Sequence, residues 1–342
     1  MRHVKSALIV VLVVSLPAIV GLRGTAAVPS QKSVPNEEST QTDSERAKLV
    51  GTYQLIGRET KDANGTWQPT PNFNSIGYIT YSDTGYMGVH VMPNDRTPFT
   101  GAQPTAQEAK AALQGYTAYY GPFSTDEDED GKFVVHHRIG QINPGGEVDA
   151  KRFYDFESDR LILTPAAADG SKEQAARRVL WERLPEVPLS NEAKQFVGFR
   201  QLLYTDRYTE REGRQVTHGQ RNESRAGSYI IYTPTGHMMV HLMAREGRTP
   251  YDGATPTPEE ALAAYRSFGG YFGRFTVHEG AVPPYVVHHQ EGRPRPSVLP
   301  TDAERLYQLD GAVLRLGGRP RTSDGENTGG HLYWEMLPAR PE

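Results

Sequence analysis

The pattern of hydrophobic and polar positions is typical of short β-strands over most of the chain. Residues 77–81 and 86–92 are rich in Val, Ile, Tyr and Met, and they flank the tetrapeptide Ser82-Asp83-Thr84-Gly85. Because Gly85 accepts the positive φ of a tight turn, the two segments are predicted to form a β-hairpin. Four later segments of the same character are also predicted strands: 133–142, 151–156, 160–164 and 178–184.

One helix is predicted between the hairpin and the later strands. Thr105-Ala106-Gln107-Glu108 is a capping-box pattern, in which the threonine oxygen and the glutamate carboxylate accept hydrogen bonds from exposed amides. The apolar face of this helix is predicted to comprise Ala109, Ala112, Leu113, Tyr116 and Tyr120.

The whole pattern occurs twice, which indicates an internal duplication. A linker with two prolines, at residues 184–190, separates the predicted units 46–186 and 191–338. Because each unit has its own strands and helix, residues 45–186 are expected to fold alone. The main repeated motifs are Arg96-Thr97-Pro98 with Arg248-Thr249-Pro250, Thr105 to Glu108 with Thr257 to Glu260, His136-His137 with His288-His289, Arg152 and Tyr154 with Arg305 and Tyr307, and Trp181-Glu182 with Trp334-Glu335.

The first 27 residues have the features of a cleaved signal peptide. Arg2, His3 and Lys5 form a basic start, an apolar run spans residues 7–20, and small residues occupy positions 25–27. Residues 28–45 are polar and contain prolines, so we interpret them as a flexible tether. These features predict an exported protein, periplasmic or secreted, with no stable membrane span after cleavage.

The net charge and the lack of cysteine exclude some classes of binding partner and some kinds of site. The chain of 342 residues has a net charge of −4 and no cysteine. This charge provides no basic field for a nucleic acid, so no nucleic-acid partner is expected. The lack of cysteine excludes disulfides, thiolate metal sites and cysteine nucleophiles.

These motifs together resemble the bacterial lipocalin-like domain family. The resemblance rests on the run at residues 77–87, on Tyr119-Tyr120-Gly121, on the Val-His-His and Arg-x-Tyr strands, and on the closing Trp-Glu-Arg. It covers residues 46–184 closely and 193–337 more loosely, with departures at 207–224 and 293–300. It implies an all-β fold with one short helix per unit: a tandem pair of lipocalin-like, calycin-type antiparallel β-barrels, each with a pocket.

Arg152 and Tyr154 are the strongest candidates for contact with a ligand. Alternation along a strand places both on one face, while Lys151 and Asp155 share the opposite, solvent-facing side. A guanidinium group beside a tyrosine suits a carboxylate, enolate or phenolate, so the pair is predicted at the polar end of the first pocket. The alternative is a structural pair between Arg152 and Glu182.

The histidines are further candidates. Because neighbours on a strand point to opposite faces, one of His136 and His137 is expected inside the barrel and the other outside. His90 is interpreted either as a core histidine or as a ligand contact. Two tyrosines from the family-like motifs complete the predicted ligand-binding set: Tyr81 and Tyr119.

Templates for catalysis or for metal binding are not found in the sequence. There is no Gly-x-Ser-x-Gly, no His-Glu-x-x-His and no nucleotide-binding glycine pattern, so no metal site and no cofactor are predicted. The acidic run 126–130 lacks calcium-loop spacing and is predicted to be an exposed hairpin tip.

Three functions fit the sequence. The first is binding of a small hydrophobic or amphipathic molecule in a barrel pocket. The second is a cofactor-free isomerase, cyclase or lyase that uses His, Tyr and Arg in the barrel. The third is a structural interaction module of the cell envelope, and the sequence alone does not separate these alternatives.

Overall fold

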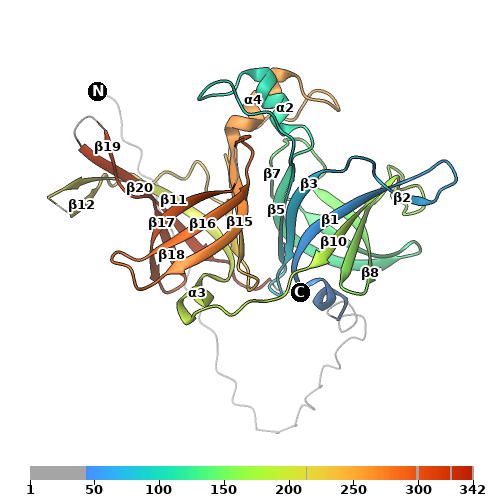
Figure 1. The fold of residues 1–342 in the computed structure, drawn as a ribbon, viewed down its shortest axis with the longest axis horizontal. Coiled ribbons are helices and arrows are strands. Elements are labelled where there is room, and N and C mark those ends of the chain that lie inside the picture. Colours follow the sequence, from blue (N-terminus) through green and yellow to red (C-terminus); the bar gives the residue numbers. More distant parts are fainter. Residues whose placement is uncertain (1–43, 213, 298–299, 324–325, 341–342) are drawn as a thin grey trace, which may run out of the picture.

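The computed structural model describes residues 44–212, 214–297, 300–323 and 326–340. The predicted signal peptide and nearly all of the predicted tether lie outside these residues. The described chain forms two antiparallel sheets that each close into an eight-stranded barrel, and the barrels stand side by side (Figure 1).

The first barrel closes by pairing of its first and last strands. The order around the barrel is β1, β3, β4, β5, β6, β8, β9 and β10, and β10 pairs back onto β1. Its strands are β1 (Gly51–Lys61), β2 (Trp67–Pro69), β3 (Ser75–Tyr81), β4 (Tyr86–Pro93), β5 (Thr117–Asp128), β6 (Gly131–His137), β7 (Gly140–Gln141), β8 (Asp149–Glu157), β9 (Arg160–Pro165) and β10 (Arg177–Arg183).

The second barrel repeats this topology, and β11 pairs with β20 to close it. Both barrels have a register shift at the same place in the closing pair, between Leu55 and Gly57 and between Leu202 and Tyr204. Its strands are β11 (Gly198–Arg211), β12 (Arg214–Thr217), β13 (Tyr229–Tyr232), β14 (His237–Met243), β15 (Phe268–His278), β16 (Tyr285–Gly292), β17 (Thr301–Asp310), β18 (Val313–Gly317), β19 (Arg321–Ser323) and β20 (Glu326–Met336).

The predicted hairpin and strands are confirmed. β3 and β4 pair in antiparallel register around a turn whose Gly85 has φ +89°, and the Ser82 amide donates to the Tyr86 carbonyl at 2.8 Å. The predicted strand 133–142 is divided into β6 and the short β7. The acidic run lies at the exposed tip between β5 and β6, where the Lys151 amine contacts the Asp128 carboxylate.

The helices begin as predicted but end earlier. Both capping boxes form in full, at the start of α2 (Ala106–Leu113) and of α4 (Pro258–Ser267). Gly115, at φ +74°, follows the first helix. Tyr116 and Tyr120 were therefore wrongly assigned to the helical face: Tyr116 follows the helix and Tyr120 lies in β5. Their burial comes from packing between the barrels.

Each barrel has an apolar interior that a short helical segment closes at one end. Residues 44–49 are helical and lie under the first barrel, where the Tyr53 hydroxyl donates to the Leu49 carbonyl at 3.0 Å. α3 (Asn191–Phe196) has the same place under the second barrel, and its Phe196 packs edge-on against Tyr232. The other end of each barrel lies on the side of α2 and α4 (Figure 1).

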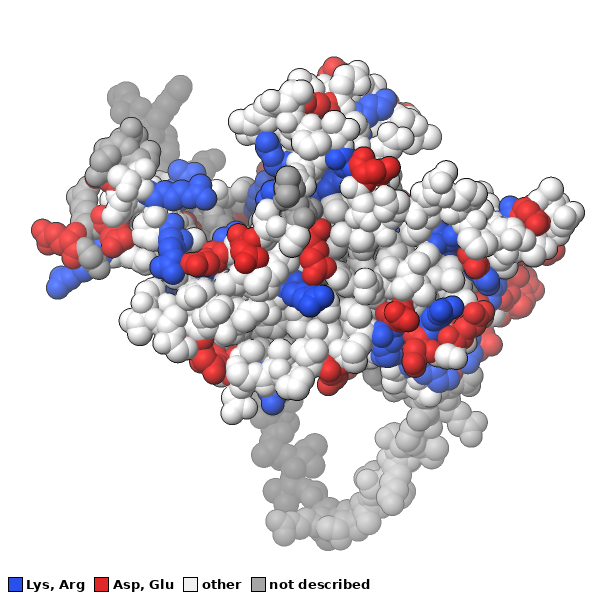
Figure 2. Space-filling model, in the orientation of Figure 1, with Lys and Arg blue, Asp and Glu red and all other residues white. Residues whose placement is uncertain are grey.

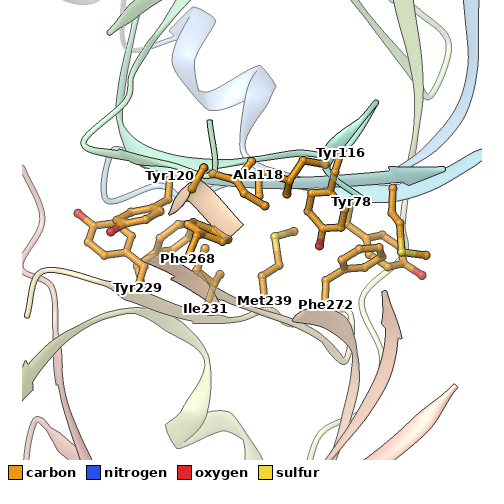
Figure 3. Packing of buried hydrophobic residues seen from close by; sticks show 14 of the residues in the cluster. Tyr78, Tyr116, Ala118, Tyr120, Tyr229, Ile231, Met239, Phe268 and Phe272 are labelled. Atoms are coloured by element: carbon orange, nitrogen blue, oxygen red, sulfur yellow. The ribbon is translucent and has the colours of Figure 1, made fainter. Parts of the chain in front are cut away.

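A third apolar core fills the junction between the barrels, and sequence periodicity did not reveal it. Figure 3 shows its side chains between facing sheets, with labelled residues of β3 and β5 on one side and of β13, β14 and β15 on the other. Each copy contributes eight buried residues. They are Tyr78, Tyr86, Met92, Leu113, Tyr116, Ala118, Tyr120 and Ile142 from the first copy, and Phe199, Tyr229, Ile231, Met239, Ala261, Ala264, Phe268 and Phe272 from the second.

The repeated Arg-Thr-Pro motif ties the barrels together. The Arg96 guanidinium donates to the carbonyls of Arg293 and Pro294 at 2.6 and 2.8 Å. Its counterpart Arg248 crosses in the opposite direction to the carbonyls of Gln141 and Ile142, at 2.7 and 2.9 Å. The departure of the second copy at 293–300 thus supplies acceptors for an arginine of the first.

Candidate functional site

The interior of the first barrel contains a cavity of about 590 Å³. This volume is within the range of roughly 300–1,000 Å³ that is common for small-molecule sites. The deep wall of the cavity is apolar, and it comprises Leu55, Ile79, Val89, Leu163 and Trp181. These side chains come from β1, β3, β4, β9 and β10, so the cavity exists only because the sheet closes.

Arginines gather at the open end of this cavity. Arg152 lies on β8 opposite Pro165, the last residue of β9, and Arg177 is the first residue of β10. Arg58 lies near the end of β1, and Arg138 directly follows β6. Antiparallel pairing brings these positions to one mouth, where all four arginines line the cavity.

The charge of the mouth is unbalanced. Among the described residues that line the cavity, Asp95 is the single acidic side chain against four arginines. The outer surface differs, because on the face shown in Figure 2 basic and acidic side chains lie interspersed, most densely over the first barrel. The excess of positive charge is therefore found at the mouth of the cavity and not on the outer surface shown in Figure 2.

Arg152 and Arg138 have only weak internal partners. The Arg152 guanidinium donates to the Lys151 carbonyl at 2.7 Å, and its nearest carboxylate oxygen, on Glu147, is 3.8 Å away. Arg138 lies over the Tyr119 ring at 4.3 Å, and burial lowers the pKa of its guanidinium. The alternative pair of Arg152 with Glu182 does not form, because Trp181 faces inward and Glu182 is exposed on the other side of β10.

His136 is the inward member of its pair and bridges two tyrosines. Its Nε2 lies 2.8 Å from the Tyr81 hydroxyl and its Nδ1 lies 2.9 Å from the Tyr119 hydroxyl. Burial lowers the pKa of His136 well below its usual value, and the nearby Arg152 and Arg138 add to this effect. The neutral imidazole thus donates to one tyrosine and accepts from the other.

The same bridge occurs in the second barrel. His288 lies 2.8 Å from the Tyr232 hydroxyl and 2.7 Å from the Tyr271 hydroxyl. A bridge that both barrels contain is explained by the fold, since it satisfies a buried imidazole and links β13, β15 and β16. In the first barrel Tyr119 also lines the cavity, whereas Tyr81 and His136 lie behind it.

Three predicted residues lie away from the cavity. The Tyr154 hydroxyl points to the closed end, where it donates to Glu45 at 3.2 Å, as Tyr307 does to Glu192 in the second barrel. His137 lies on the outer face, 2.7 Å from Asp149. His90 lies at the junction of the barrels, where its ring stacks on His241 with centroids 4.3 Å apart.

Of the predicted set, Arg152 and Tyr119 therefore line the cavity together. Sequence reasoning missed Arg138 and Arg58, and it did not place Trp181 at the wall of a cavity. Strand alternation contained the signal for Arg138, because it lies two residues after His136 and so shares the inward face.

Two other cavities lie outside the first barrel. One of about 480 Å³ borders the junction beside Arg96 and Glu291. Another, of about 540 Å³, lies against β11 and β20, where Asp206 accepts hydrogen bonds from His331 and Tyr333 at 2.9 and 2.8 Å. Within the part of the chain that the structure describes, no three His, Asp or Glu side chains are grouped to hold a metal ion.

The fold defines a tandem barrel protein whose first barrel encloses a cavity. The chain belongs to the lipocalin-like domain family, whose model matches residues 50–184 and again 210–336. No helix among the described residues has the length and apolar character needed to cross a membrane.

Other comparisons add little. No curated protein matches the chain. A Nostoc punctiforme protein of unknown function from the DUF3598 family is 9% identical, with 86% of this chain and 99% of that chain covered and a TM-score of 0.21. The tesB protein of Mycobacterium avium subs paratuberculosis is 12% identical, with 76% and 96% covered and a TM-score of 0.10.

Proposed function

We propose that the first barrel binds a small hydrophobic or amphipathic molecule in its interior. The observation that supports this most is the cavity itself, which combines a wall of Leu55, Leu163 and Trp181 with a polar mouth. Burial of apolar ligand surface against such a wall contributes about 25 cal/mol per Å², and the polar mouth fixes orientation. The Tyr–His–Tyr bridge recurs in the second barrel, so a catalytic role for it is not part of the proposal.

Filling the cavity is expected to weaken binding. N-phenyl-1-naphthylamine, a neutral dye that brightens in apolar surroundings, is expected to bind the full chain and report through its fluorescence. Val91→Trp places an indole at the cavity wall and is expected to weaken dye binding at least about ten-fold, because the dye and the indole compete for one volume.

The matched control is Leu242→Trp, at the equivalent position of β14 in the second barrel. It is expected to leave dye affinity unchanged. Equal dye affinity in wild type and Val91→Trp would show that the dye binds elsewhere, and the proposed site would then be wrong. Circular dichroism and thermal unfolding of both variants establish that they are folded.

We also propose that the protein is exported, on the grounds of its basic start, apolar run and small residues at 25–27. The mature chain is expected to begin near Val28. Mass spectrometry of the N-terminal peptide from exported protein tests this, and retention of Met1 in that material would contradict cleavage.

A further inference from the structure

The mouth of the cavity holds two neighbouring guanidinium groups that share one nearby carboxylate, that of the exposed Glu147. The Nε of Arg138 is buried and has no hydrogen-bond partner among the described residues. Its Nη1 reaches only neutral oxygens, the Gln141 side chain at 3.4 Å and the Glu147 carbonyl at 3.3 Å. Arg152 is 16% exposed, and the Glu147 carboxylate 3.8 Å from it belongs to a side chain that is 57% exposed.

This arrangement is unfavourable without a counter-ion. A cation withdrawn from water loses hydration free energy, and two cations near each other add repulsion, unless an anion compensates both. Burial is the main cause that lowers the pKa of Arg138; Arg152 lowers it further, whereas Tyr119 and Glu147 raise it in part. Guanidinium groups are the donors best suited to hold an oxyanion with two parallel hydrogen bonds.

The second barrel shows that the fold does not need three of the four arginines at the mouth; Arg152 recurs as Arg305, and each donates to the carbonyl of the preceding residue. Arg138 corresponds to Gln290, two residues after the bridging histidine in each copy. Arg58 corresponds to Thr205 and Arg177 to Gly330, by the same place in the β1–β10 and β11–β20 registers. The structural features recur in both copies, namely the histidine bridge, the inward tryptophan and the tyrosine–glutamate bond at the closed end. Three of the four arginines do not recur.

We propose that the ligand of the first barrel is an anionic amphiphile, whose apolar body lies against Trp181 and Leu163 and whose oxyanion is held by Arg138 and Arg152. This inference rests on the proposed binding function and names the class of its ligand. A carboxylate at the end of an alkyl or aromatic body is the simplest member of that class. Arg58 and Arg177, farther out at the mouth, attract the anion as it approaches.

Two probes of equal chain length test the charge. Decanoate and decanol, both below their aggregation limits, compete with bound N-phenyl-1-naphthylamine on the full chain. Decanoate is expected to displace the dye at a concentration at least about ten-fold lower than decanol, because charge-assisted hydrogen bonds form only with the carboxylate. The difference between the two displacing concentrations is expected to become smaller in the wild type at 1 M NaCl, because salt screens the attraction between the carboxylate and the partly exposed arginines.

Arg138→Gln introduces the residue that the second barrel already has. It is expected to bring decanoate and decanol within about three-fold of each other, with each displacement corrected for the dye affinity of that variant. Arg305→Gln, which changes the second barrel's counterpart of Arg152, is the control for an arginine substitution outside the cavity and is expected to keep the wild-type ratio. If Arg138→Gln does not fold, Arg177→Gln at the exposed edge of the mouth is expected to reduce the ratio in the same direction.

The outcomes separate this inference from the function on which it rests. Equal displacement by decanoate and decanol in the wild type, with tight dye binding, overturns the anionic ligand and leaves the binding cavity intact. An unchanged ratio in both mouth variants overturns the role of the arginines. No dye binding by the folded wild type overturns the binding function and this inference with it.

Discussion

Acidification from pH 7 to pH 5 is expected to lower the free energy of unfolding by about 2 kcal/mol for each fully buried histidine. Burial lowers the pKa of His90 and of His288 to about 3, and it lowers those of His136 and His241 well below the usual value. Each has an exposed fraction of zero.

The direction follows from the protons that each state binds. Below about pH 6.5 the unfolded chain protonates these histidines. In the folded chain His90 and His288 are protonated only near pH 3, and burial holds the pKa values of His136 and His241 well below the usual value. Their contribution to stability is therefore complete above pH 6.5 and is lost progressively as the pH falls toward 3. Glu108 and Glu260, whose pKa values are lowered by backbone hydrogen bonds, lose their contributions only below about pH 4.5, outside this window.

Urea unfolding at pH 7, 6 and 5 measures the effect. His288→Gln removes one buried titrating group and is expected to reduce the loss of stability between pH 7 and pH 5 by about 2 kcal/mol, the contribution of one such group. His289→Gln changes the adjacent, outward histidine, which lies 2.8 Å from Asp302 on the surface, and is the control for a histidine substitution on the same strand. A stability that does not vary between pH 7 and pH 5 would contradict this account.

Local signals predicted most of the fold. The turn at Gly85 and the capping box at Thr105 depend on residues adjacent in sequence, so their geometry could be inferred without tertiary information. The strands that carry the repeated motifs could be predicted for the same reason. The end of the first helix could not be predicted, because Tyr116 and Tyr120 match helical spacing but are buried by the other barrel.

The site was predictable only in part. Strand alternation shows which side of a strand a residue is on, but it does not show which other residues that side contacts. Strand alternation correctly predicted that one of His136 and His137 lies inside the barrel, and it correctly placed Arg152 on the inward face. Distance along the strand then decides the role: Arg152 reaches the mouth, while Tyr154, two residues deeper, reaches Glu45 at the closed end. His90 faces another barrel, a neighbour that its own strand does not indicate.

When the two copies are expressed separately, each half is expected to be unstable without the other. Residues 44–186 alone would expose eight apolar and aromatic residues of the shared core, among them Tyr116 and Tyr120, which are 1% exposed in the full chain. Each large side chain of this kind contributes about 1.5–3 kcal/mol on burial. Exposing all of them therefore costs more than the free energy of unfolding of a typical small domain. This revises the expectation that residues 45–186 fold alone.

Co-expression of residues 44–186 with residues 187–342 is expected to give a 1:1 complex with a dissociation constant below about 1 µM, measured by light scattering and calorimetry. Gly88→Val is expected to weaken it at least ten-fold, since a Cβ there would lie 2.4 Å from Ile231 Cδ1 and overpacking costs about 1–3 kcal/mol. Gly57→Val is the control, because a Cβ at that position meets no atom within 4 Å. If the halves instead remain monomeric, separate and as stable as the full chain, the junction contributes nothing to folding, and the two barrels are independent domains.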